Sequence, residues 1–173
     1  MKHKHYNPDR FTRKSLRLPN RDYTAAGAYF VTIHAFPSHS FFTIPKLHQI
    51  LAATWQTLAK RFPNVKLDAF VIMPDHIHFI LWLDGTKRKW MALGNIVGAY
   101  KSITTVLWLK HLKAIGKDME YPCQIWQDDY YEHVVRIGEL EATRQYIRDN
   151  PKKALSQLPH VNSDEADFTG KQV

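Results

Sequence analysis

The spacing of apolar and polar positions changes along the chain and separates extended segments from helices. Runs rich in aromatic and β-branched residues predict strands over residues 28–36, 65–73 and 76–83. Apolar residues at helical spacing predict helices over 44–62 and 91–114, and an acidic first turn favours a third helix over 139–150. The segment 124–137 is predicted to carry a fourth short strand or an irregular extended stretch.

Prolines and turn residues divide these elements. Pro63 and Asn64 stop the first helix, the tripeptide MPD makes a turn before the third strand, and Pro151 is expected to end the third helix at Asn150. The order β-α-β-β-α-β-α predicts an α+β fold. Its first six elements match the ferredoxin-like split βαβ, an antiparallel sheet with helices on one face, and the C-terminal helix is additional.

The length and composition suit one domain. The chain has 173 residues, of which 45% are hydrophobic, and this suffices for a core of its own. We place the domain at residues 23–155, between a basic N-terminal arm over 1–22 and a tail over 156–173. The arm contains seven lysines and arginines and could lie on nucleic-acid phosphates or simply be mobile.

The charge balance points to a polyanionic partner. Lys and Arg number 24 against 16 Asp and Glu, for a formal net charge of +8. This excess favours a nucleic acid or an anionic membrane, although solubility alone could also explain it. Cys123 is the single cysteine, which excludes an intrachain disulfide and a thiolate metal cluster. Without a signal-like or membrane-length apolar run, a cytoplasmic location is expected.

Two histidines interrupt the apolar third strand. Because side chains alternate along a strand, His76 and His78 are predicted to point to the same face. Two neutral imidazoles on one face make half of a divalent-metal site, but they could also be two unrelated histidines. Asp75 could orient one ring or cap the turn. Several residues could supply the third ligand, and spacing alone does not choose among them: His34, Asp68, Asp128, Glu132, His133 and Asn150.

Four motifs carry a family resemblance, and they occur in this order: MPDHIHFILWL, GAYKS, IWQDDYYEHVVR and YIRDNPKKA. The first is similar to the HUH motif (His, bulky hydrophobic, His) of single-tyrosine transposases. Together, over residues 23–154, they resemble the REP-associated tyrosine transposases, relatives of the small insertion-sequence enzymes. HIH alone recurs by chance, whereas MPDHIH followed downstream by YIxxNPxxA is specific.

The resemblance implies a mechanism and a set of site residues. It implies metal-dependent cleavage and rejoining of single-stranded DNA at hairpin-forming repeats, through a 5′-phosphotyrosine intermediate. By motif, the nucleophile falls on Tyr146, and Asn150 joins His76 and His78 as a ligand of Mg²⁺ or Mn²⁺. Tyr146 and Asn150 are four residues apart, on one helical face. Relatives act as monomers or homodimers, and no membrane partner is expected. Tyr146 could instead be a core aromatic residue, and Asn150 a helix cap.

Further residues are candidates for contact with DNA. Tyr130 and Tyr131 are rival nucleophiles that we interpret as packing or base-stacking residues. A solvated surface role is an alternative for the basic candidates, which are Lys101, Arg136, Lys87, Arg88, Lys89 and Arg21. Two other functions remain open. One is a non-catalytic module that binds hairpin DNA or RNA. The other is a histidine-based metallohydrolase with a water nucleophile.

Overall fold

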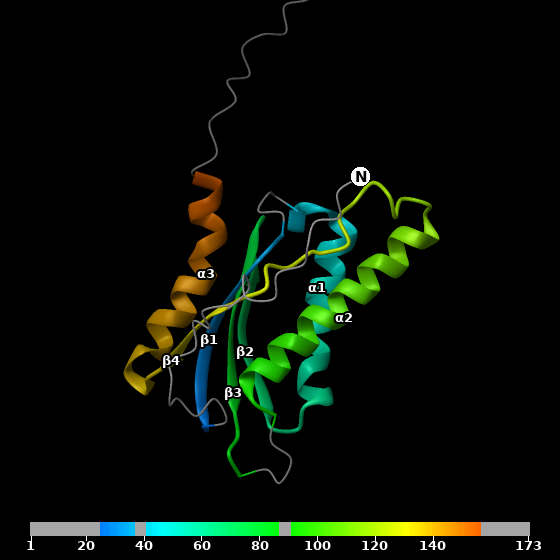
Figure 1. Ribbon diagram of the computed structural model, residues 1–173. Coiled ribbons are helices and arrows are strands. Elements are labelled where there is room, and N and C mark those ends of the chain that lie inside the picture. Colours follow the sequence, from blue (N-terminus) through cyan, green and yellow to red (C-terminus); the bar gives the residue numbers. More distant parts are fainter. Residues whose placement is uncertain (1–24, 37–40, 87–90, 157–173) are drawn as a thin grey trace, which may run out of the picture.

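The computed structural model describes residues 25–36, 41–86 and 91–156, which form a sheet with helices on both faces (Figure 1). The strands are β1 (Gly27–His34), β2 (Val65–Ile72), β3 (His76–Leu83) and β4 (Tyr131–Val135). The helices are α1 (Pro45–Arg61), α2 (Leu93–Ala114) and α3 (Leu140–Ser156), with short 3₁₀ turns η2 (Phe41–Thr43) and η3 (Ile137–Glu139). The predicted α+β class is confirmed.

The sheet is antiparallel, with the strand order β2-β3-β1-β4. β3 therefore lies between β1 and β2, as two interleaved βαβ units require. The register places His76 opposite His34, and His78 opposite Thr32. Thr32 is in turn paired with Tyr131 of β4. Directly paired residues share a face, so this row of side chains crosses three strands.

α1 and α2 cover one face of the sheet and bury most of the apolar core (Figure 1). The two helices are also joined by a hydrogen bond, in which the hydroxyl of Tyr100 donates to the carbonyl of Leu51 at 3.0 Å. Fully buried side chains of this core include Val31, Ile33, Leu47, Leu51, Phe79 and Trp108. The packing of α1 and α2 fixes the strands, and the side chains on the opposite face of the sheet are positioned by those strands.

α3 covers the opposite face and runs toward the end of the sheet where β1 ends and β3 begins (Figure 1). Its apolar contact is narrow. Among the described residues of α3, Ile147 is the one fully buried apolar side chain. It packs in a small cluster with Ala28, Ile80 and Val135. Polar contacts must therefore carry much of the attachment of this helix.

A bulge in β2 serves that attachment. Leu67 pairs with Leu81, and Phe70 pairs with Phe79, so two residues, Asp68 and Ala69, lie opposite the single residue between those partners. An extra residue of this kind bends a strand and changes the direction of a side chain. The carboxylate of Asp68 here faces α3.

The short strand predicted within 124–137 is confirmed at Tyr131–Val135, and the segment before it lies along α2. The ammonium group of Lys101 holds it by donating to the carbonyls of residues 127–129 at 2.9, 3.1 and 3.0 Å. The predicted end of the third helix at Asn150 is wrong, because α3 continues to Ser156 with Pro151 inside. Proline disfavours helix at the residue before it, but here the sheet packs against this turn and outweighs that preference.

In the described part of the chain, the helices are all too short or too polar to cross a membrane.

Candidate active site

The imidazoles of His76 and His78 converge. Both rings lie on the face of the sheet that α3 covers, and their Nε2 atoms are 3.0 Å apart. The other nitrogen of each ring is engaged. Nδ1–H of His76 donates to the carboxylate of Asp75 at 2.7 Å, and Nδ1 of His78 lies 2.8 Å from the hydroxyl of Thr32. Each ring is thus held at its Nδ1 atom, with its Nε2 atom directed at a shared point.

Burial keeps the central ring neutral. His78 is buried, and this burial, followed by the proximity of His76 and of His34, lowers its pKa to about 4. The pKa of His34 is also lowered, first by burial and then by His76. The carboxylate of Asp75 can only accept a hydrogen bond, so the neutral ring of His76 carries its proton on Nδ1. The lone pair on Nε2 of His76 therefore faces Nε2 of His78, at hydrogen-bond distance.

Tyr146 of α3 lies against the same ring. The ring centroids of Tyr146 and His78 are 5.6 Å apart, and the centroid of Tyr146 is 6.0 Å from that of Phe30. Phe30 of β1 also stacks on His78, at 5.2 Å. The Tyr146 side chain is 45% exposed. A phenol is thus fixed beside the histidine pair on one side and accessible to solvent on the other, which argues against a purely core role.

Asn150 lies one helical turn beyond Tyr146. Its side chain is 8% exposed, and its Nδ2 atom is buried without a hydrogen-bond partner. It is not a helix cap, because α3 continues past it. A buried amide without a partner is costly, and rotation of the amide would present its oxygen instead. Asn150 is therefore a buried amide on the same helical face as Tyr146, with a donor that no described residue satisfies.

These donors suit a small divalent ion. Neighbouring ligands at about 2.1 Å from one ion and roughly 90° apart lie about 3 Å from each other, as the two Nε2 atoms do. The candidate donor set is two imidazoles and an amide. The amide oxygen is of the type that suits Mg²⁺ and Mn²⁺, whereas imidazole is the more usual ligand of Zn, Cu, Fe and Ni. Among the described residues, no group of three or more His, Cys, Asp or Glu side chains is placed to hold a metal. A metal ion bound at this pair would therefore need an amide or water as a further ligand.

Comparison with known proteins decides the family. The family model of IS200-like transposases matches residues 38–150, which is well over half of the chain. This chain belongs to the IS200-like transposases. The resemblance expected from the four motifs is thereby confirmed, and membership implies a DNA-processing enzyme.

Two solved structures share the fold of this IS200-like transposase. The chain superposes on a REP-associated tyrosine transposase bound to a REP hairpin with a TM-score of 0.58 at 20% identity, covering 80% of this chain and 74% of the other. It superposes on a candidate transposase from Deinococcus radiodurans R1 with a TM-score of 0.52 at 17% identity, covering 77% and 97%. An uncharacterised protein of Haemophilus influenzae is 28% identical, with 84% of this chain and 92% of that protein covered.

Of the other five candidate ligands of the transposase, one lies beside the histidine pair and four lie elsewhere. His34 lies beside His76, with ring centroids 5.3 Å apart. The carboxylate of Asp68 is bound by Arg144. His133 lies 3.3 Å from Glu139. The two other candidates also lie away from the histidine pair. Glu132 is paired with Val31 and so faces α1 and α2, and the carbonyl of Asp128 accepts from Lys101.

The candidate DNA contacts separate into three groups. Lys101 directs its ammonium group to backbone carbonyls, so it orders the segment before β4, although the residue remains partly exposed. Arg136 is exposed just after β4. Arg21 and the three basic residues Lys87, Arg88 and Lys89 lie outside the described residues, as does the arm over 1–22.

The two adjacent tyrosines are separated by the fold. Tyr130 packs against the large core. Tyr131 is 60% exposed and shares a cross-strand row with Thr32 and His78. Sequence reasoning did not identify Phe30 and Thr32 as site residues. Both lie on the same face of one strand, but only the cross-strand register brings them to His78, and a single sequence does not reveal register.

Proposed function

We propose that this transposase cleaves and rejoins single-stranded DNA at hairpin-forming repeats, with Tyr146 as the nucleophile. The observation that supports this most is the contact of the Tyr146 and His78 rings within one chain, at 5.6 Å between centroids. The hairpin bound to the REP-associated relative supports the substrate class. The net charge of +8 suits a polyanion.

Cleavage exchanges one phosphate ester for another. The hydroxyl oxygen of Tyr146 forms a bond to the scissile phosphorus, and the bond from phosphorus to the 3′ oxygen breaks. The phenol gives up its proton, and the departing 3′ oxygen takes one from solvent. The products are a 5′-phosphotyrosine and a free 3′-OH. Rejoining reverses these bond changes with the 3′-OH of another strand, so no ATP is needed.

His76, His78 and Asn150 are the residues that we propose to hold Mg²⁺ or Mn²⁺. When bound, such an ion would neutralise charge on the non-bridging phosphate oxygens and orient the phosphate. The chain itself contributes the orientation of the two rings, through Asp75 and Thr32. Burial also keeps His78 neutral, so that its lone pair is available at neutral pH.

The test is a covalent-adduct assay with Tyr146→Phe. The probe is a labelled library of DNA hairpins with randomised single-stranded flanks, incubated with Mn²⁺ and resolved under denaturing conditions. The parent protein should select members of the library as a denaturant-stable adduct, and Tyr146→Phe should form none while binding the selected hairpin with unchanged affinity. Tyr131→Phe is the matched control, since it removes an exposed phenol from the same face, and it should form adduct at the parental rate.

Each other outcome rejects the assignment in a distinct way. Adduct formation by Tyr146→Phe would exclude this residue as the nucleophile. Hairpin binding by the parent without any adduct would favour a non-catalytic binding module. Cleaved DNA without an attached protein would favour a metallohydrolase that uses water.

The same contact supports action in cis. Because Tyr146 and His78 of one chain already meet, a mixture of Tyr146→Phe and His78→Ala proteins should form no adduct. Restored adduct in that mixture would show that the tyrosine is supplied to a second subunit.

A further inference from the structure

We propose that Asp68 and Arg144 form a positioning clamp that sets the rotation of α3 about its axis and so holds the Tyr146 hydroxyl at the histidine pair. This inference rests on the proposed function of Tyr146. It assigns to two residues remote from the metal ligands a role in the rate of the reaction.

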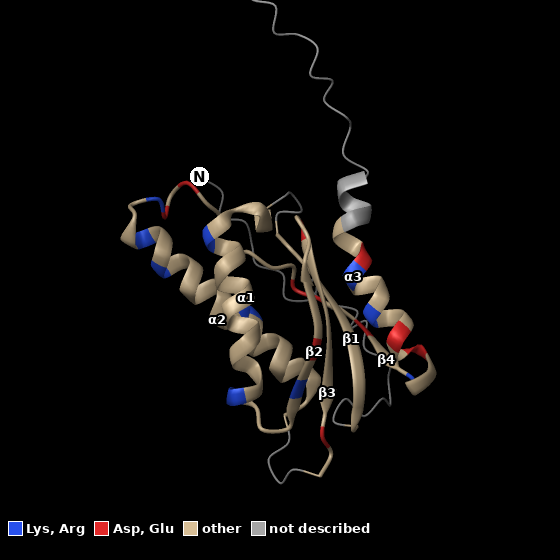
Figure 2. Cartoon of the chain, turned by 180° about the vertical axis from the view of Figure 1, so that it is seen from behind, with Lys and Arg blue, Asp and Glu red and all other residues tan. Residues whose placement is uncertain are grey.

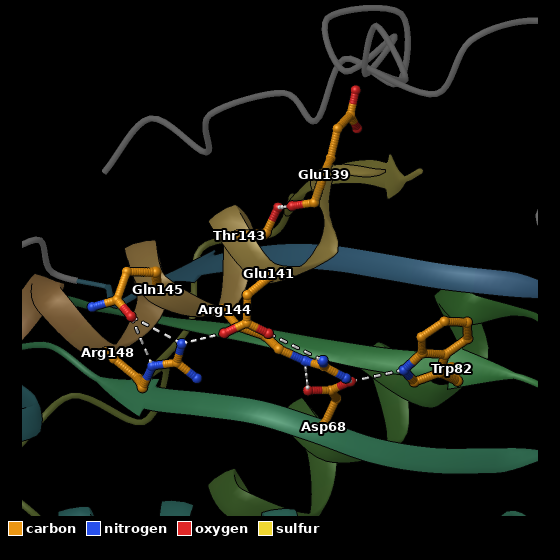
Figure 3. A network of polar contacts seen from close by, with 8 residues as sticks. All are labelled: Asp68, Trp82, Glu139, Glu141, Thr143, Arg144, Gln145 and Arg148. Carbon is orange, nitrogen blue, oxygen red and sulfur yellow. Dashed lines mark hydrogen bonds and ion pairs between the residues drawn. The ribbon is translucent and has the colours of Figure 1, made fainter. Parts of the chain in front are cut away.

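Asp68 and Arg144 form a bidentate ion pair. Nε of Arg144 donates to Oδ1 of Asp68 at 2.8 Å, and Nη2 donates to Oδ2 at 2.6 Å (Figure 3). The indole N–H of Trp82 donates to Oδ2 as well, at 2.8 Å. The Asp68 side chain is only 12% exposed. Bidentate arginine–carboxylate pairs fix orientation as well as distance, and the Trp82 contact restrains the carboxylate from the β3 side.

The pair stays ionised over a wide pH range. The hydrogen bonds from Arg144 lower the pKa of Asp68, and the hydrogen bonds to Asp68 raise the pKa of Arg144. The clamp is therefore present at any pH where the enzyme would act. Strand alternation places the Asp68 carboxylate on the face of α3, because its neighbour Leu67 packs against the large core.

Helical geometry couples the clamp to the nucleophile. Residues of an α-helix are about 100° apart around its axis. Tyr146 therefore lies about 100° to one side of the buried Ile147, and Arg144 lies about 60° to the other side. Arg144 and Tyr146 therefore lie on opposite sides of the line along which α3 contacts the sheet. Because the helix is rigid, fixing the position of Arg144 also fixes the position of Tyr146. A rotation of roughly 20° would move a side chain about 5 Å from the axis by nearly 2 Å.

The remaining contacts of α3 leave that rotation poorly determined. Ile147 is its one fully buried apolar side chain among the described residues. The other charged contacts of the helix run along it. Arg148 donates to Glu141 and Gln145 of the same helix, at 2.5 and 2.9 Å for Nη2 (Figure 3). Such contacts support helix formation but do not join the helix to the sheet.

The experiment compares Arg144→Gln with Arg148→Gln on the selected hairpin. A misplacement of about 1 Å can slow a reaction by roughly a hundredfold. Arg144→Gln should therefore slow single-turnover adduct formation by about 10- to 100-fold while changing hairpin affinity less than about twofold. Arg148→Gln, the matched arginine without a sheet contact, should react at the parental rate.

Hydrogen exchange gives a readout independent of activity. In Arg144→Gln, amides of α3 should exchange faster while those of β1 and β3 keep parental protection. Arg144→Lys, which keeps the charge without the fork, should lie between parent and Arg144→Gln in rate. Asp68→Asn with Arg144→Gln should be no slower than Arg144→Gln alone, because the two side chains act as one unit.

Three results would overturn the clamp. The first is adduct formation at the parental rate in Arg144→Gln. The second is an equal slowing in Arg148→Gln. The third is loss of hydrogen-exchange protection across the whole sheet in both Arg144 variants, because this would show that the pair only stabilises the fold. Failure of the proposed function is distinguishable, because Tyr146→Phe would then still form adduct. If Tyr146→Phe is inactive and Arg144→Gln reacts normally, only the clamp is wrong.

Discussion

The two faces of the sheet are built differently. The face under α1 and α2 holds the large apolar cluster, whereas the face under α3 holds a small cluster and the polar networks. Charge differs too: α1 and α2 contain five lysines and one arginine but no acidic residue, while α3 carries both signs (Figure 2). The histidine pair and Tyr146 are on the second face. The large core and the proposed chemistry therefore lie on opposite sides of one sheet.

This division has a physical reason. Burial of apolar surface stabilises a fold but has no preferred direction. The large core therefore fixes the positions of the strands, but it leaves little room for accessible polar groups on that face. A site needs orientation and access, which hydrogen bonds and a lightly attached helix provide. Segments with few buried apolar contacts are also the ones that open locally. Substitutions on the two faces should therefore separate stability from activity.

The largest effect is expected from His78→Ala. It should abolish Mn²⁺ binding in calorimetric titration and reduce adduct formation below detection, because one of two converging Nε2 atoms is lost. His48→Ala is the matched control, since His48 is an exposed histidine on α1, and it should change neither quantity. Unaltered Mn²⁺ affinity in His78→Ala would refute the metal role of this residue.

The opposite pattern is expected from Leu51→Ala on α1. Leu51 is fully buried in the large cluster, and such truncations lower the free energy of unfolding by about 2–5 kcal/mol. Urea unfolding followed by circular dichroism measures the loss. At a temperature where the variant remains folded, its adduct rate should match the parent. A slowed reaction in the folded variant would show that the core face also tunes the site.

The helices and strands could be predicted from the sequence, but the residues that surround the histidine pair could not. Periodicity located β3 at its observed bounds and placed His76 and His78 on one face, because alternation is a local property. Tyr146 and Asn150 followed from the motif and the helical repeat. Phe30, Thr32 and the Asp68–Arg144 pair could not be predicted, because strand register and a bulge depend on contacts between distant segments. The helix end predicted from Pro151 was wrong for a related reason, since tertiary packing outweighed the local preference of proline to end a helix.

A smaller effect is expected from Thr32→Val. Removing the hydroxyl that lies 2.8 Å from Nδ1 of His78 leaves this ring nitrogen without its partner. Losing such a supporting contact typically weakens metal affinity by about 10- to 100-fold, measurable by Mn²⁺ titration. Thr32→Ser, which keeps the hydroxyl, should stay near the parental affinity. Equal weakening in both variants would point to the packing of this side chain instead, because Thr32→Ser keeps the hydroxyl.

The smallest effect is expected from Tyr131→Ala, which tests whether DNA would reach the proposed site over the exposed part of the α3 face. Tyr131 is 60% exposed, in the row that leads through Thr32 to His78, so a base next to the scissile phosphate could stack on its ring. Stacking on an aromatic side chain contributes about 1–3 kcal/mol per base. Tyr131→Ala should therefore weaken binding of a flanked hairpin by this amount at fixed salt, and Tyr131→Phe should not.

The decisive comparison for Tyr131 is a hairpin without its single-stranded flanks, measured by fluorescence anisotropy. Tyr131→Ala should bind that shortened probe with the parental affinity, because the stacked base is absent from it. Ile137→Ala removes another highly exposed apolar side chain, at 90% exposure, and should leave both affinities unchanged. If Tyr131→Ala weakens both probes equally, the residue contacts the hairpin stem, and the single strand must reach the histidine pair across another part of the sheet.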